Sequence, residues 1–112
     1  MANGILQGTS GTNPVTPTAA TDTTVYEVPV DTFAVISVNA VNRGVTEATL
    51  SVAIASTTTP TASEWIEFET SVLPKGVLER TGVVVDSGKF IVVNTSSGDF
   101  TVMVYGIETA TA

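Results

Sequence analysis

The sequence contains no histidine and no cysteine among its 112 residues. A Ser-His-Asp or Cys-His catalytic arrangement is therefore excluded, because the general base does not exist. A zinc site of the usual His/Cys type is excluded for the same reason, and disulfides and thiol chemistry cannot occur. We therefore expect no catalytic residues, no metal and no cofactor. The chain is predicted to be a binding or building-block protein, not an enzyme.

Positive charge is scarce as well. The four cations are Arg43, Lys75, Arg80 and Lys89, against 11 carboxylates, and the formal net charge is −7. Few groups can neutralise phosphates, so we expect no nucleic acid partner and no attraction to an anionic membrane surface. No apolar run approaches the ~20 residues of a membrane-spanning helix. The N-terminal residues show neither the basic nor the apolar region of a secretory signal.

The sequence is rich in short polar residues and poor in charged ones. The chain has 20 Thr and 9 Ser, while charged residues make up 13% and hydrophobic residues 43%. The usual charged fraction is about 25%. Threonine suits the outer face of a strand, which predicts a neutral, hydrogen-bonding surface. A chain of this length forms one domain that buries roughly two-thirds of its unfolded surface.

The composition divides the chain into three parts. Residues 1–22 are rich in Gly, Pro, Thr and Ser, with Ile5, Leu6 and Val15 as apolar anchors. Such a segment cannot stabilise itself, and long polar termini are ordered only when something holds them. We expect an extended arm that lies on a neighbouring subunit or partner; the alternative is an arm packed on its own domain. Residues 23–108 form the domain, and 109–112 a short tail.

From residue 23 onward, turn-forming residues recur at short, even spacing. No segment shows the apolar periodicity of a helix. The apolar and alternating segments predict about seven strands, at 23–28, 33–42, 47–56, 64–72, 77–85, 89–95 and 99–108. Regular short strands of this kind are typical of two antiparallel sheets packed face to face. The predicted fold is an all-β sandwich, Ig-like or jelly-roll in topology.

One strand combines an aromatic residue with carboxylates. Along residues 64–72, Trp65, Glu67 and Glu69 are predicted to share one face, and Phe68 the other. With Glu64 nearby, two of these carboxylates could form the pair that glycoside hydrolysis requires. The same three glutamates could also supply oxygen ligands to calcium. A solvated strand face explains the same pattern more simply, because hydrolysis needs a cleft, which a domain of this size rarely has, and no Asp-rich calcium loop occurs in the sequence. We therefore assign Trp65 to partner binding.

Several segments resemble small structural proteins of tailed bacteriophages, especially those of marine cyanobacteria. The matching stretches are 23–29 (TTVYEVP), 38–44 (VNAVNRG), 73–82 (LPKGVLERTG), 86–89 (DSGK) and 104–108 (VYGIE). The resemblance spans residues 23–108, and its motifs are strand and turn patterns. It implies a virion component with a β-sandwich fold.

A free-standing sandwich with a polar arm is most similar to a capsid cement or decoration protein. The resemblance implies a location on the outer surface of the capsid, the major capsid protein as partner, and self-association, for example as a trimer. Residues Ile5, Leu6 and Val15 are the predicted capsid anchors. The alternatives are a neck, tail or fibre-associated adaptor, or a carbohydrate-binding adhesion module in which Trp65 forms the stacking platform.

Overall fold

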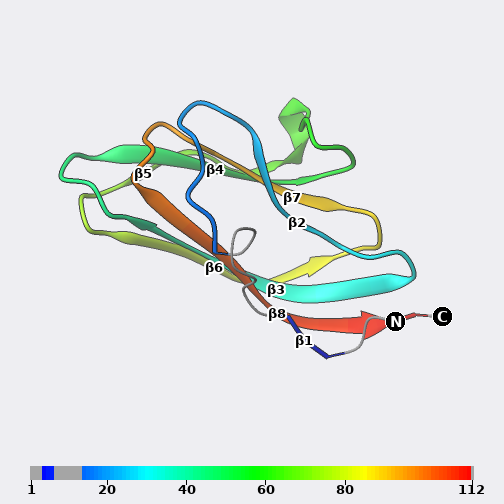
Figure 1. Cartoon of the computed structure of the whole chain (residues 1–112). Coiled ribbons are helices and arrows are strands. Elements are labelled where there is room, and N and C mark those ends of the chain that lie inside the picture. The colour runs from blue at the N-terminus through cyan, green and yellow to red at the C-terminus, as the bar shows by residue number, and fades with distance from the viewer. Residues whose placement is uncertain (1–3, 7–13, 112) are drawn as a thin grey trace.

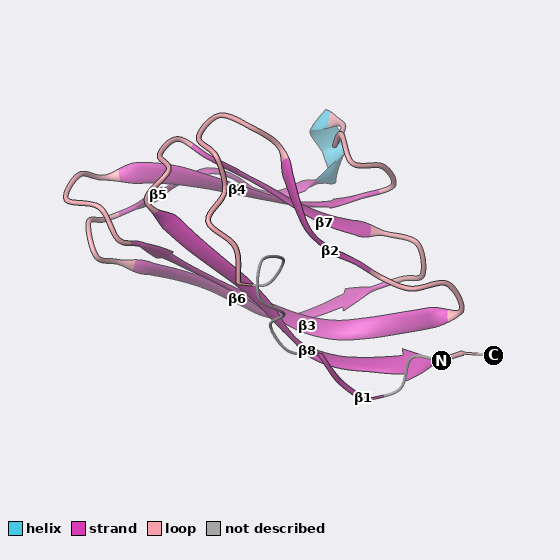
Figure 2. Ribbon diagram, viewed as in Figure 1, coloured by secondary structure: helices cyan, strands magenta, loops and turns pink. Residues whose placement is uncertain are grey.

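The computed structural model describes residues 4–6 and 14–111. Within these ranges the chain forms eight β-strands and one short 3₁₀ helix (Figure 2). The elements are β1 (Gly4–Leu6), β2 (Thr23–Glu27), β3 (Thr32–Asn42), β4 (Ala48–Ala55), η1 (Ala62–Glu64), β5 (Trp65–Val72), β6 (Val77–Val85), β7 (Phe90–Thr95) and β8 (Phe100–Ala110). The all-β prediction is confirmed.

The strands form two antiparallel sheets that pack face to face (Figure 1). Sheet I has the order β1-β8-β3-β6, and sheet II has the order β2-β7-β4-β5. The pairs β4–β5, β3–β6, β2–β7 and β1–β8 are nested, so the chain is one long hairpin rolled around its own core. This is the strand arrangement of a jelly roll, which decides between the two sandwich topologies that the sequence left open.

The core lies between the two sheets and is made mainly of valine and other aliphatic residues. In β3, buried and half-buried positions alternate from Thr32 to Asn42, as expected for a strand with one face toward the core. Phe100 is the largest side chain that is fully buried. The buried inward-facing residues of both sheets include Ile36, Val38, Leu50, Val52, Ile91, Val93, Val102 and Val104.

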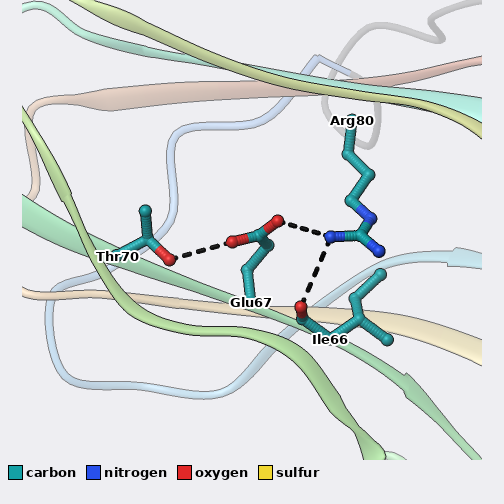
Figure 3. Close-up of polar contacts among 4 residues, drawn as sticks. All are labelled: Ile66, Glu67, Thr70 and Arg80. Atoms are coloured by element: carbon teal, nitrogen blue, oxygen red, sulfur yellow. Dashed lines mark hydrogen bonds and ion pairs between the residues drawn. The ribbon is translucent and has the colours of Figure 1, made fainter.

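Polar side chains connect the two sheets at both open edges of the sandwich. At one edge, the Tyr26 hydroxyl of β2 donates a hydrogen bond to the Glu108 carboxylate of β8. At the other, Glu67 of β5 accepts hydrogen bonds from Arg80 of β6 (2.6 Å) and from Thr70 (3.0 Å), as Figure 3 shows. These contacts stabilise the sandwich where apolar packing ends.

The seven predicted strands all exist, with ends displaced by at most two residues. The predicted tail starts later than expected, because β8 continues to Ala110, which pairs with Thr32. The eighth strand, β1, lies in the segment that was predicted to be an arm. Its three residues pair with 106–108 of β8, and Val15 forms a bridge to Val102.

The described parts of residues 1–22 therefore pack on the chain's own domain, which is the alternative that the sequence left open. Val15 packs against the core, Pro17 is buried, and the Ala20 N–H donates to the Thr95 carbonyl (2.7 Å). Figure 1 shows this segment crossing from sheet I to β2 in sheet II. No helix within the described ranges is long and apolar enough to cross a membrane.

Candidate functional site

The structure does not bring the four predicted partner-binding residues together. Ile5 and Leu6 lie in the edge strand β1, opposite Ile107 and Gly106; their side chains lie outside what the structure describes. Val15 is half-buried against the core. Trp65 lies on the outer face of sheet II, since it pairs with Ala53 and packs with Ala53, Ala55 and Val92. A single site formed by all four is not present.

Two of the three carboxylates near Trp65 have separate structural partners. Glu64 accepts hydrogen bonds from the Thr61 N–H (2.9 Å) and the Ser56 N–H (3.0 Å), and these bonds lower its pKa. Glu67 is held by Arg80 at the open edge. Within residues 4–6 and 14–111, no group of three or more acidic side chains could hold a metal ion. A calcium site built from three of these carboxylates therefore finds no support among the described residues.

The prediction that Phe68 and Trp65 face opposite sides of the strand is wrong. The register of β5 against β4 shifts twice, between Leu50 and Val52 and between Val52 and Ala53. The second of these shifts sets Trp65 and Glu67 opposite the adjacent residues Ala53 and Val52, so one extra residue, a β-bulge, stands in β5 between Trp65 and Phe68 and puts both on the same face. As a result the Trp65 and Phe68 rings meet with centroids 5.9 Å apart, at an interplanar angle of 59°.

This aromatic pair borders a recess on the outer face of sheet II, which we call the aromatic groove. Its volume is about 270 Å³. Lining residues from β4, β5 and β7 and the loop after β7 include Ser51, Trp65, Phe68, Glu69, Asn94 and Ser96. A second recess, of about 580 Å³, lies on the Ala62 side of the same two rings. Phe68 is 63% exposed, so its ring is available to a ligand.

The polar side chains of the aromatic groove are held in place by hydrogen bonds. Ser51 Oγ accepts from the Glu69 N–H (2.8 Å), and Ser96 Oγ accepts from the Thr49 N–H (2.8 Å). Asn94 Nδ2 donates to Asp22 Oδ1 (2.9 Å). Because both serine oxygens act as acceptors in these bonds, their O–H groups can still donate to a ligand.

The opposite side of the sandwich, the outer face of sheet I, is mainly apolar. Because Ala34 and Ile36 point into the core, Val35 between them points outward, and it pairs with Val84 on one side and Ile107 on the other. Val84 is 66% and Ile107 51% exposed. We call this surface the apolar face; its residues are Phe33, Val35, Val41, Val77, Val84, Met103 and Ile107.

The middle of the apolar face carries polar groups and a shallow recess. The Tyr105 hydroxyl donates to the Glu79 carboxylate (2.7 Å), and this bond raises the pKa of Tyr105. A recess of about 490 Å³ is lined by Pro14, Asn39, Val41, Thr101, Met103 and Tyr105. The face is therefore able to receive a partner's side chains without presenting a strong charge.

Sequence reasoning missed this face, although β3 carried a signal for it. An antiparallel strand with one solvated face alternates between apolar and polar residues. In β3, the outward positions are Phe33, Val35, Ser37, Asn39 and Val41, so the outer face of the strand carries more apolar residues than a solvated face usually does. Phe68 could not have been found, because the bulges depend on how β5 meets β4.

The class that the fold defines is a jelly-roll β-sandwich with two dissimilar outer faces. Comparisons of the chain with protein-family models, with curated proteins and with solved structures found no match.

Proposed function

We propose that the chain is a capsid decoration protein, which docks on the major capsid protein through the apolar face and reinforces the shell. The observation that carries the proposal is the row formed by Val84, Val35 and Ile107 across three adjacent strands. The sequence resemblance to small phage structural proteins supports the same function, and the jelly roll is a fold that viral capsid proteins use.

The physical properties of the apolar face suit permanent assembly on a protein shell. Contiguous exposed apolar patches mark interaction surfaces, and burying one Val or Ile side chain contributes about 1.5–3 kcal/mol. The residues of the row itself are uncharged, and the Glu79 carboxylate on the same face is bonded to the Tyr105 hydroxyl. The overall affinity for the lattice would rise further if several binding sites were engaged at the same time.

Co-sedimentation with capsids tests the docking surface. Val84→Glu and Ile107→Glu, combined, place two charges in the row at positions that are already exposed, so the fold is expected to survive. Each charge would have to be buried on docking, which is costly when it is unpaired. We expect capsid binding to fall by more than about tenfold. Circular dichroism and the melting temperature of the variant check that the domain is folded.

The matched control is Phe68→Glu, which places a charge at a similarly exposed position on the opposite side of the sandwich. It should leave capsid binding at the wild-type level. Equal binding by the double variant and the wild type would exclude the apolar face as the docking surface. Loss of a dimer or trimer in analytical ultracentrifugation, with capsid binding retained, would assign this face to self-association instead.

The structure changes how the N-terminal segment can be tested. If residues 1–22 served only as a capsid anchor, removing residues 2–20 would abolish capsid binding without affecting stability. Val15 and Pro17 are, however, part of the packed domain, so this deletion should also lower the melting temperature. Substitutions on the apolar face separate docking from folding more cleanly.

A further inference from the structure

We infer that the aromatic groove is a binding site for neutral oligosaccharides. This inference goes beyond capsid docking and does not depend on it. It concerns the outer face of sheet II, which is the opposite side of the sandwich (Figure 1). A particle that carried the chain by its apolar face would therefore present the aromatic groove to the medium.

The first argument is the rigidity of the aromatic platform. Trp65 covers Ala53, Ala55 and Val92, three outward-facing residues of sheet II that are fully buried. One side of the indole is therefore fixed by packing, and little conformational entropy is lost when a ligand binds to the other side. The exposed Phe68 ring stands at an angle beside it. The C–H face of a pyranose ring packs on such an apolar surface.

The second argument is the polar lining beside the rings. A sugar presents hydroxyl groups along its edge, and these need both donors and acceptors. The O–H groups of Ser51 and Ser96 are available to donate, as derived above. Asn94 contributes an amide oxygen and a second N–H, and Glu69 a carboxylate. A purely apolar ligand would leave these polar groups without hydrogen-bond partners, which is unfavourable. The lining therefore favours a ligand that has hydroxyl groups.

The third argument is charge, which decides the kind of glycan. Arg80 is paired with Glu67 at the open edge, and Lys89 Nζ donates to Ser56 Oγ (2.9 Å). Lys75 Nζ donates to the Arg43 carbonyl. None of these cations lines the aromatic groove, whereas Glu69 does. Sialylated, sulfated or uronate sugars would meet a negative charge without a cation, so the ligand is expected to be neutral.

The two recesses indicate that more than one sugar ring is bound. The smaller recess lies beside Ser51 and Asn94, and the larger lies beside Ala62; both are lined by Trp65 and Phe68. An oligosaccharide that crosses the aromatic pair would contact both. Short chains should therefore bind more tightly than the corresponding monosaccharide.

Trp65 makes a direct assay available, because it is the chain's single tryptophan. The full-length protein is first screened on a glycan array with neutral and acidic members, and hits are titrated while the Trp65 fluorescence is followed. We expect saturable binding to neutral oligosaccharides and none to their acidic counterparts. Phe68→Ala should weaken binding by about fivefold to tenfold, as expected for one aromatic contact. Val84→Ala, on the opposite face, should have no effect.

Trp65→Ala is not informative alone, because the indole also covers buried residues of sheet II; Phe68→Ala serves as the variant with less effect on packing, because Phe68 is 63% exposed. Three outcomes would overturn the inference. These are no binding to any neutral glycan, binding only to acidic glycans or to a proline-rich peptide, and glycan binding that Phe68→Ala leaves unchanged. Capsid co-sedimentation of Phe68→Ala should remain at the wild-type level, so failure here is distinguishable from failure of the docking proposal.

Discussion

Gly106 provides the sharpest test of how the two central strands of sheet I approach each other. It lies in β8, opposite Ile36 of β3, and has φ +153°. A Cβ added at this position would lie 2.1 Å from the Val35 carbonyl oxygen and 2.9 Å from the Ile36 Cα. Both are backbone atoms of the neighbouring strand, so neither can move aside without distorting the sheet. The perturbation is Gly106→Ala.

The expected cost has two parts. Forcing extra volume into packed structure costs typically about 1–3 kcal/mol, and holding a non-glycine residue at such a φ costs about 1–3 kcal/mol more. We expect Gly106→Ala to lower the free energy of unfolding by about 2–6 kcal/mol. Native domains are stable by only about 5–15 kcal/mol. The single added methyl group is therefore expected to remove a large part of the free energy of unfolding.

Gly82→Ala is the matched control, because Gly82 also has a positive φ (+69°) but has nothing within 4 Å of an added Cβ. It should cost only about 1–2 kcal/mol, the backbone penalty alone. Urea unfolding followed by circular dichroism measures both variants, provided that the slope m stays constant. Equal unfolding free energies for the two alanine variants would refute the close approach of β8 and β3 at Gly106.

Three further substitutions test the polar contacts. Asn42→Ala should cost about 2–4 kcal/mol in urea unfolding, because the buried amide donates to the Thr46 and Val72 carbonyls. Burial, and then the bond to the Glu108 carboxylate, raise the pKa of Tyr26. The stability that this provides is present below about pH 10 and is lost at higher pH, as the unfolded chain releases the phenolic proton first. Tyr26→Phe should therefore flatten the alkaline decline of the melting temperature. Arg80→Met should cost less than about 1 kcal/mol, since the ion pair is largely solvated, and a loss that grows with added salt would contradict this.

Most of the fold was predictable because turn residues and alternation act locally. The segment 77–85 was predicted with its correct bounds, between the turn at Pro74–Gly76 and the turn at Asp86–Gly88. β1 was not predicted, because three residues are too few to show alternation. Strand order was also beyond the sequence, since it depends on which pairs of distant strands meet across the sandwich.

The candidate surfaces were predictable only in part. Trp65 was identified from its type and position, and the structure places it on an outer face. The role of Phe68 depends on the bulge between Trp65 and Glu67, which is set by the pairing of β5 with β4 and not by a local motif. The apolar face follows in part from β3, whose outward positions carry Phe33, Val35 and Val41 beside the polar Ser37 and Asn39.

The central proposal is that the chain decorates a capsid through its apolar face, and the copy number per particle tests it most directly. On this proposal the chain is encoded by a phage, and quantitative mass spectrometry of that phage's purified virions would compare the amount of the chain with that of the major capsid protein. We predict a number that equals, or is a simple fraction of, the number of major capsid subunits. A handful of copies that match tail symmetry would assign the chain to the neck, tail or fibres, and its absence from the particle would contradict the proposal altogether.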